Sequence, residues 1–405
     1  MQKPTGGRPP QLSRWLRLER IVILGAMISM APMGTDIYLP ALPALQHAFA
    51  TGAGQVQLTL STFFLGFALG QAVYGPISDR FGRRPPLFAG LSLFAVASVG
   101  CAYAPTIEAL TALRFLQAVG ACAGMVIARA MVRDLFDVRD AVRVFSTLML
   151  VVGLAPILAP LLGGYLLLWF GWRSIFLLLA GFGVLVVAAA WLRLDETHAP
   201  NPAGSLSPGK VAGVYVNLLT DARFMGYALS GGVTIAGMFA YIAGSPFVFI
   251  DLYGVPAEHF GWVFGANAFG FVAGAQVNGR LMRGADPHRV LALALLMQVG
   301  AGFALLLAAL TGIGGLIGIW APLFVYLTGL GFIMPNATAL ALAPHGAHAG
   351  AASALLGVMQ FGLASLAASA MGAIQTASPV PMALLVVGAA LLGLAVNRVL
   401  VGKKT

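Results

Sequence analysis

Charged residues are scarce in this sequence, because Asp, Glu, Lys and Arg make up 9% of its 405 residues whereas 59% are hydrophobic. A water-soluble fold of this length needs several times more charged side chains to cover its surface. The composition therefore excludes a soluble globular protein and predicts an all-α membrane protein. The 51 glycines and 23 prolines suit membrane helices that pack closely and bend.

Cysteine is also scarce, since the chain contains only Cys101 and Cys122. They fall in different predicted helices, so neither a disulfide nor a cysteine metal site is expected. His345 and His348 have an H-x-x-H spacing near a turn, and we expect them at the membrane interface rather than on a metal. No catalytic cluster and no phosphate-binding glycine-rich loop is visible. The sequence thus predicts no enzyme, no cofactor and no metal.

Long apolar runs of about 20 residues, enough for a helix to cross a bilayer, recur along the whole chain. They predict twelve membrane-spanning helices, which cover residues 19–45, 55–78, 85–104, 107–133, 140–168, 172–193, 220–247, 258–281, 288–311, 314–338, 350–375 and 380–399. An even number of spans places both termini on the same side of the membrane.

The basic residues indicate which side that is. If the N-terminus is cytoplasmic, every Lys and Arg except Arg114 and Arg173 lies in a cytoplasmic segment or at its membrane edge. This asymmetry is the positive-inside rule. It predicts a multi-pass protein of a bacterial inner membrane with both termini in the cytoplasm. The net charge of +10 therefore needs no nucleic-acid partner.

Two glycine patterns recur with a single offset of 204 residues. The segment GFALG at 66–70, followed by Gly75, matches GFVAG at 270–274, followed by Gly279, and Gly153 matches Gly357. Such repetition indicates a duplicated six-helix unit with two parallel repeats. The alternative is chance similarity among glycine-rich helices.

The duplication predicts three segments. Residues 1–194 form an N-terminal six-helix bundle, residues 195–219 a cytoplasmic linker, and residues 220–405 a C-terminal six-helix bundle. Two pseudo-symmetric bundles joined by a polar linker are typical of alternating-access transporters, whose substrate site lies near the bilayer midplane between the halves. A channel would not need the duplication.

Asp36 is a carboxylate inside the first apolar run, where an ionised group costs about 2.5–3.5 kcal/mol on insertion scales. Such a residue carries protons, pairs with a cation or binds substrate; the alternative is a purely structural acid. Arg114 in span 4 lies at a depth that differs by only about 6 Å at 1.5 Å per residue. We therefore predict that Asp36 and Arg114 interact, directly or through water, and couple proton movement to transport. Arg114 could instead only hold span 4 in place.

The loop between spans 2 and 3 reads GPISDRFGRR over residues 75–84. This pattern resembles the signature of the major facilitator superfamily. The resemblance implies that Asp79 faces span 11 and that Arg83 reaches Asp134, which together form a latch for the outward-facing state. The residues assigned to this latch are Gly75, Asp79, Arg80, Arg83 and Asp134. The alternative is a charged turn anchored by phospholipid.

Four further segments resemble the drug:proton antiporters of the Bcr/CflA (bicyclomycin and chloramphenicol resistance) type. They are GTDIYLPALP at 34–43, LRFLQ at 113–117, ARAMVRD at 128–134 and IMPNA at 333–337. The likeness covers nearly the whole chain and implies export of small amphiphilic compounds in exchange for protons. The sequence does not show the oligomeric state, but one chain already contains a whole translocation pathway, so we expect a functional monomer.

Span 5 departs from the family pattern. The antiporter motif normally ends in Gly-Pro-x-x-Gly-Gly, whereas this chain has APLLGG over residues 159–164. The residues assigned to the motif are Gly153, Pro156, Pro160, Gly163 and Gly164. The second-half copy of the loop signature is also degraded, since Arg283 stands where the first half has Asp79.

Polar, aromatic and thioether side chains suit an adaptable apolar substrate pocket. The candidates, for each of which ordinary helix packing is the alternative, are Tyr38, Gln117, Met238, Tyr241, Asn267, Asn336 and Gln360.

The sequence therefore predicts a proton-driven exporter of small amphiphilic drugs or toxic compounds that works by alternating access. One alternative is an exporter of a specific metabolite such as an amino acid or a sugar. It is disfavoured because a polar substrate needs several charged groups in the cavity, and only Asp36 and Arg114 are available. The other alternative, an integral-membrane enzyme, lacks a catalytic constellation.

Overall fold

The computed structural model describes residues 14–136, 138–198, 208–374 and 378–401, which form helices joined by turns, without a strand. The elements of the first half are α1 (Arg14–Asp36), η1 (Leu39–Ala41), α2 (Leu42–Ala48), α3 (Ala53–Phe81), α4 (Arg84–Ala102), α5 (Ile107–Leu135), α6 (Val138–Phe170) and α7 (Trp172–Arg193). Those that follow are α8 (Pro208–Thr220), α9 (Ala222–Pro246), η2 (Phe247–Leu252), α10 (Ala257–Leu281), α11 (Pro287–Thr311), α12 (Gly315–Leu342), η3 (Ala343–His348), α13 (Ala349–Ala373), α14 (Val380–Val396) and η4 (Asn397–Val401).

Twelve long helices match the predicted spans. Within the described residues, eleven helical segments are long and apolar enough to cross a membrane. The twelfth, α10, is less apolar but has 25 residues, about 37 Å at 1.5 Å per residue. Its polar side chains are tolerated because α10 packs between α6 and α12 and is not surrounded by lipid.

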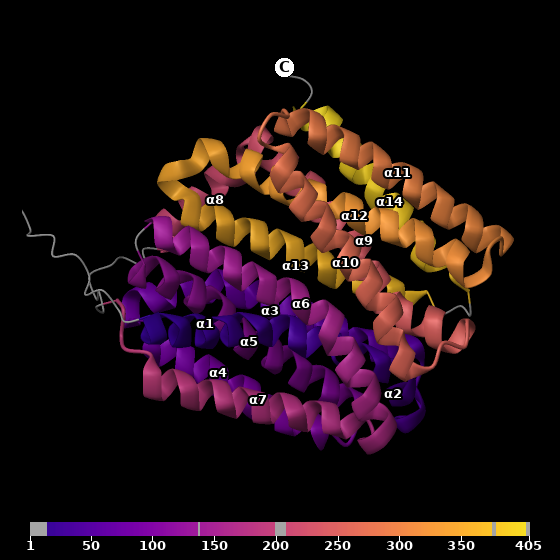
Figure 1. Ribbon diagram of the computed structural model, residues 1–405, viewed down its shortest axis with the longest axis horizontal. Coiled ribbons are helices and arrows are strands. Elements are labelled where there is room, and N and C mark those ends of the chain that lie inside the picture. Colours follow the sequence, from indigo (N-terminus) through magenta and orange to yellow (C-terminus); the bar gives the residue numbers. More distant parts are fainter. Residues whose placement is uncertain (1–13, 137, 199–207, 375–377, 402–405) are drawn as a thin grey trace, which may run out of the picture.

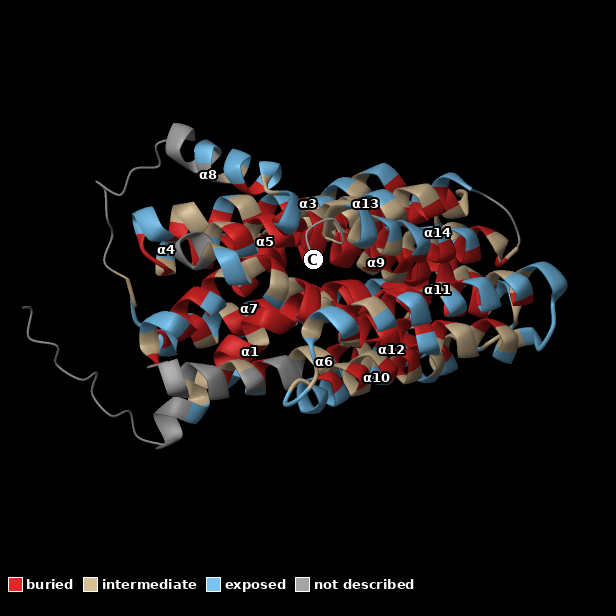
Figure 2. Cartoon of the chain, turned by 90° about the horizontal axis from the view of Figure 1, so that it is seen from above, coloured by how far each residue is buried: buried red, intermediate tan, exposed pale blue. Residues whose placement is uncertain are grey.

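The helices form two bundles, α1 to α7 and α9 to α14, which lie one below the other in Figure 1. The bundles meet along two helix pairs, α3 with α13 and α6 with α10. Figure 2 shows buried residues along the interior and exposed ones on the outer faces. Many exposed side chains are large and apolar, including Leu185, Trp191 and Ile317, as a lipid-facing surface requires.

The repeated glycines occupy equivalent places in the two halves. A Cβ atom on Gly66 of α3 would lie 2.6 Å from the carbonyl oxygen of Phe115 on α5, and one on Gly270 of α10 would lie 2.8 Å from the ring of Phe324 on α12. Each glycine therefore lets two helices of the same bundle approach closely. The predicted pseudo-symmetric six-helix bundles are confirmed.

The second glycine pair contacts the opposite half instead. Gly153 on α6 faces Val272 on α10, and Gly357 on α13 faces Gln71 on α3. The 204-residue repeat thus relates the two contact surfaces between the halves as well as the packing inside each half.

The first predicted span, 19–45, is not one continuous helix, which corrects the sequence-based expectation. α1 ends at Asp36, a short η1 follows, and α2 begins at Leu42. Pro40 and Pro43 lack the N–H groups that a continuous helix would need. Asp36 therefore lies at the break between two helices rather than inside one.

The predicted linker, 195–219, contains part of the helix α8, which contacts α9 and α13. An ion pair between Arg20 and Asp195 joins the start of this segment to α1, and one between Arg193 and Glu19 joins the end of α7 to α1. We call this end of the molecule, which carries Arg20, Arg83 and Arg193, the basic end. The far end carries α2, η2 and Ser378.

Candidate functional site at the junction of the two halves

Asp36 is buried, with 5% of its surface exposed. Its Oδ1 atom accepts a hydrogen bond of 3.0 Å from the Thr35 hydroxyl. Within the described residues, no basic side chain lies within 4 Å of the carboxylate. The η1 turn that follows Asp36 contacts α6 of its own half and both α9 and α10 of the other. The acid therefore lies where the two bundles meet.

Arg114 on α5 is fully buried in the first half. Its Nη1 donates to the carbonyl oxygen of Gly34 at 2.9 Å and to Oε1 of Gln117 at 2.6 Å. The guanidinium carbon lies 4.5 Å from the ring centre of Tyr38 and 4.3 Å from that of Phe63. Aromatic faces stabilise the cation in place of water. Nε and Nη2 have no hydrogen-bond partner.

Within the described residues Asp36 and Arg114 form no direct ion pair, so the water-mediated form of the predicted interaction stays a prediction. Arg114 reaches the backbone of Gly34, two residues earlier, while Asp36 is hydrogen-bonded to Thr35. A match in depth does not fix the direction in which a side chain points around its helix. The two groups are connected through α1 and not through an ion pair.

Tyr38 and Gln117, predicted to contact substrate, surround Arg114 instead. The Tyr38 hydroxyl shares a hydrogen bond of 2.6 Å with the Thr59 hydroxyl. Gln117 Nε2 donates to Ser98 Oγ at 2.7 Å. Both residues are fully buried inside the first bundle. They position the arginine and, in this conformation, do not line a space between the halves.

In the second half, Tyr241 on α9 pairs with Asn267 on α10. Asn267 Nδ2 donates to the Tyr241 hydroxyl at 3.0 Å, and Asn267 Oδ1 is buried without a partner. The Tyr241 ring stacks on Phe264 at 5.5 Å. Tyr241 is close enough to Asp36 to interact with it electrostatically. The structure thus joins these two predicted pocket residues to each other and places Tyr241 near Asp36.

The remaining pocket candidates lie elsewhere in the second half. Asn336 on α12 donates to Asn278 Oδ1 on α10 at 2.7 Å, so this pair joins two helices of one bundle. Met238 on α9 and Gln360 on α13 are half-buried.

Four phenylalanines that sequence reasoning missed connect the halves. Phe64 lies 4.5 Å from Phe239, and Phe67 lies 4.5 Å from Phe361, measured between ring centres. Phe239 and Phe361 are 5.8 Å apart. Phenylalanine is too common in apolar helices for the sequence to single these out. Together they form an aromatic contact between α3, α9 and α13.

The antiporter-motif glycines lie on α6 at the contact with α10. A Cβ atom on Gly164 would lie 2.6 Å from the carbonyl oxygen of Ala257, at the start of α10. A Cβ atom on Gly163 would collide with the carbonyl oxygen of Ile37, the residue after Asp36. Pro156 and Pro160 lie inside the same helix. The motif therefore joins the Asp36 region to the other half.

The loop signature forms an ion-pair cluster at the basic end. Arg83 Nε donates to Asp134 Oδ2 at 2.9 Å, and Arg83 Nη1 contacts Asp79. Burial lowers the pKa of Arg83, but the two carboxylates raise it by more, so its pKa lies above the usual value. Arg80 lies over the ring of Phe81. The structure thus brings Arg83 and Asp134 together.

The described residues show no hydrogen bond or ion pair between Asp79 and α13, the eleventh span, in this conformation, and the contact expected for the outward-facing state stays a prediction. Asp79 is 66% exposed and turns towards Arg83. Nothing in the described part of the chain lies within 4 Å of a Cβ atom on Gly75, and the same holds for Gly279 in the repeat. At the basic end, then, these glycine positions are open.

The two halves are also in contact at the far end. Gln57 Nε2 on α3 donates to the carbonyl oxygen of Ala243 on α9 at 3.0 Å, and Ser365 Oγ on α13 donates to the carbonyl oxygen of Ser61 at 2.8 Å. A Cβ atom on Gly372 would lie 3.1 Å from the Gly54 carbonyl oxygen. Contact between the halves therefore extends to the far end, while the signature glycines at the basic end have none.

Glu196 and Thr197 complete the cluster at the basic end, and sequence reasoning missed them. The Glu196 carboxylate accepts from the backbone N–H groups of Arg83 (2.7 Å) and Arg84 (2.9 Å), where α4 begins. Thr197 Oγ1 donates to Asp134 Oδ2 at 3.1 Å. A carboxylate at a helix N-terminus is stabilising. The signal available in the sequence was an acid directly after the sixth span.

Comparison with known proteins agrees with this arrangement. The model of the Major Facilitator Superfamily matches residues 24–372. The chain belongs to this superfamily. It is 36% identical to the MFS-type transporter YdgK of Bacillus subtilis over 93% of this chain and 94% of the relative. It is 31% identical to the bicyclomycin resistance protein homolog of Haemophilus influenzae, over 89% and 91% of the two chains.

The fold likeness extends to solved structures. A D-xylose–proton symporter matches with a TM-score of 0.72 and 16% identity, over 92% of this chain and 96% of the other. The predicted resemblance to the Bcr/CflA type is confirmed by the relatives, and the chain is a multi-pass transporter rather than an enzyme.

Proposed function

We propose that this protein exports small amphiphilic drugs or toxic compounds in exchange for protons, by alternating access. The observation that carries the proposal is Asp36, a buried carboxylate that has no basic partner among the described side chains and lies at a helix break where both halves meet. A buried acid in that position can hold a proton in one conformation and release it in another, because its surroundings change when the halves move.

Arg114 is the second element of the proposed coupling. Two of its nitrogens are unpaired, so it can stabilise an ionised Asp36 when α1 moves at the break. Its bond to the Gly34 carbonyl already connects it to the same end of α1. Substrate would compete with Asp36 for the polar groups of Tyr241 and Asn267. Substrate binding and proton release would therefore be linked.

The basic end faces the cytoplasm in this proposal, in line with the positive-inside rule. Packing at the far end then corresponds to a conformation closed towards the periplasm. The cluster around Arg83 would shift the balance between conformations without touching substrate. We further propose an inner-membrane location and the segment boundaries 1–194, 195–219 and 220–405. Because one chain holds both halves, we also propose a functional monomer.

The proposal is tested with Asp36→Asn in proteoliposomes that carry an imposed pH gradient. We expect substrate-driven dissipation of the gradient to disappear, since the amide cannot carry the proton. Glu108→Gln is the matched control, because Glu108 is an exposed acid in the first turn of α5 and should leave coupling unchanged. Coupled proton flux of normal size in Asp36→Asn would overturn the assignment.

A further inference from the structure

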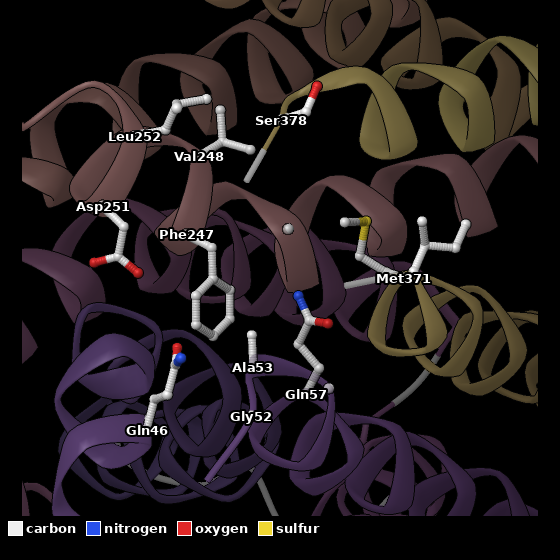
Figure 3. A pocket seen from close by; sticks show the side chains of 13 residues that line it. Gln46, Gly52, Ala53, Gln57, Phe247, Val248, Asp251, Leu252, Met371 and Ser378 are labelled. Atoms are coloured by element: carbon white, nitrogen blue, oxygen red, sulfur yellow. The ribbon is translucent and has the colours of Figure 1, made fainter. Parts of the chain in front are cut away.

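A cavity of about 330 Å³ lies at the far end, between the two halves. Figure 3 shows Gln46 and Gln57 of the first half facing Phe247, Asp251 and Met371 of the second. Its volume falls in the range of small-molecule sites, about 300–1,000 Å³. None of the residues assigned to the proton site, the latch or the substrate pocket lines it.

The cavity is separate from the Asp36 region. The hydrogen bond from Gln57 to the Ala243 carbonyl oxygen joins α3 to α9 beside the cavity. Tyr241, two residues earlier on α9, is buried and turned towards Asn267. A ligand in the cavity would therefore contact neither Asp36 nor the Tyr241 hydroxyl.

The chemistry of the lining indicates a cation with an apolar body. Asp251 is the single charged side chain among the lining residues, and no described basic group forms an ion pair with it. Phe247 provides an aromatic face, which attracts cations. Met371 provides a polarisable thioether. The amides of Gln46 and Gln57 supply neutral polar contacts at the rim and the wall.

We propose that this cavity binds small amphiphilic organic cations, such as quaternary ammonium compounds with one aromatic ring. Because its walls come from both halves, the cavity keeps its shape only while the far end is packed. A bound cation therefore stabilises the conformation that is closed at the far end and slows the return to the other one. The site is an inhibitory one, distinct from the transport pathway through the Asp36 region.

The binding test uses benzyltrimethylammonium and the purified full chain in lipid nanodiscs, followed by calorimetry. We expect Asp251→Asn to weaken binding up to about fivefold, because Asp251 is exposed and an exposed ion pair contributes at most about 1 kcal/mol. Asp251→Glu should retain binding, which shows that the fold is intact. Glu108→Gln and Asp36→Asn should bind normally. Equal affinity in Asp251→Asn and the unchanged chain would overturn the proposal.

Two further measurements test the chemistry of the site. Phenylacetate, which has a similar size and the opposite charge, should not bind. His47 is close enough to Asp251 to interact with it electrostatically, so His47→Gln should bind the cation at least as tightly as the unchanged chain. Weaker binding in His47→Gln, or binding of phenylacetate, would contradict a site built around a single carboxylate.

The conformational consequence is measured by distances between spin labels at Leu192 and Leu281, exposed positions near the basic end of α7 and α10. Saturating benzyltrimethylammonium should shift the population towards the longer distances. Asp251→Asn should abolish that shift, while Asp36→Asn should leave it in place. Normal transport together with a missing shift would reject the inhibitory site and leave the proposed function standing.

Discussion

Gly163 packs directly on the carbonyl oxygen of Ile37, so the antiporter motif of α6 touches the chain at the residue that follows Asp36. The next residue, Gly164, faces the backbone of Ala257 in the other half. Adjacent glycines on one helix thus contact the helix break on one side and the second bundle on the other. A movement of α10 against α6 would therefore reach the Asp36 region through these two backbone contacts.

Gly163→Ala should therefore impair both stability and transport. The methyl group would overlap the Ile37 carbonyl, and overpacking of this kind costs about 1–3 kcal/mol. Thermal unfolding and proton-coupled transport measure the two effects. Gly181→Ala on α7 is the control, because nothing described lies within 4 Å of its Cβ position. If the two variants behave alike, the Gly163 contact has no part in coupling.

Arg114→Lys should lower transport at least about tenfold, although the charge is kept. A lysine cannot hold both the Gly34 carbonyl and Gln117 with a planar guanidinium between the Tyr38 and Phe63 rings. Export rates in proteoliposomes give the measurement. Arg173→Lys is the matched control, since Arg173 also lies over an aromatic ring, that of Trp172, but is exposed. If the export rate of Arg114→Lys depends on pH as that of the unchanged chain does, Arg114 serves only in packing.

The two acids around Arg83 should differ in importance. The Asp134 side chain is 19% exposed and that of Asp79 is 66% exposed. Asp79→Asn should thus change stability by about 1 kcal/mol or less, as exposed ion pairs do, whereas Asp134→Asn should lower it by about 1–3 kcal/mol.

The distances between spin labels at the ends of the two halves should change more in Asp134→Asn than in Asp79→Asn. Substrate selectivity should stay unchanged in both variants. Altered selectivity in Asp79→Asn would show that Asp79 binds substrate and would remove it from the latch. A larger change in Asp79→Asn would instead indicate that its contact with span 11 forms in another conformation.

The sequence was sufficient for the helices and the duplication, because run length and glycine spacing report directly on burial in lipid and on close packing. It could not locate the break after Asp36, since hydropathy averages over the residues on either side of Pro40. It could not decide whether Asp36 and Arg114 touch directly, because depth leaves the rotation of each helix undetermined. Glu196 was missed because its partner, Arg83, lies 113 residues away.

Glu196→Gln should loosen the basic end without affecting the Arg83–Asp134 pair. Burial raises the pKa of Glu196, but four backbone N–H groups, led by those of Arg84 and Arg83, lower it by more, so its pKa lies below the ordinary 4.5. A lowered pKa means that the ionised form stabilises the folded state above the pKa of the unfolded chain. This contribution disappears as pH falls through the folded-state pKa.

The melting temperature of the unchanged chain should consequently exceed that of Glu196→Gln by a constant amount from neutral pH down to about pH 5. The difference should shrink at lower pH, as the carboxylate of the unchanged chain becomes protonated. Asp195→Asn is the control, because the Asp195 side chain is 84% exposed in its pair with Arg20, and it should leave the melting temperature unchanged. A difference that grows as pH falls would mean that the neutral acid, and not the carboxylate, holds the N-terminus of α4.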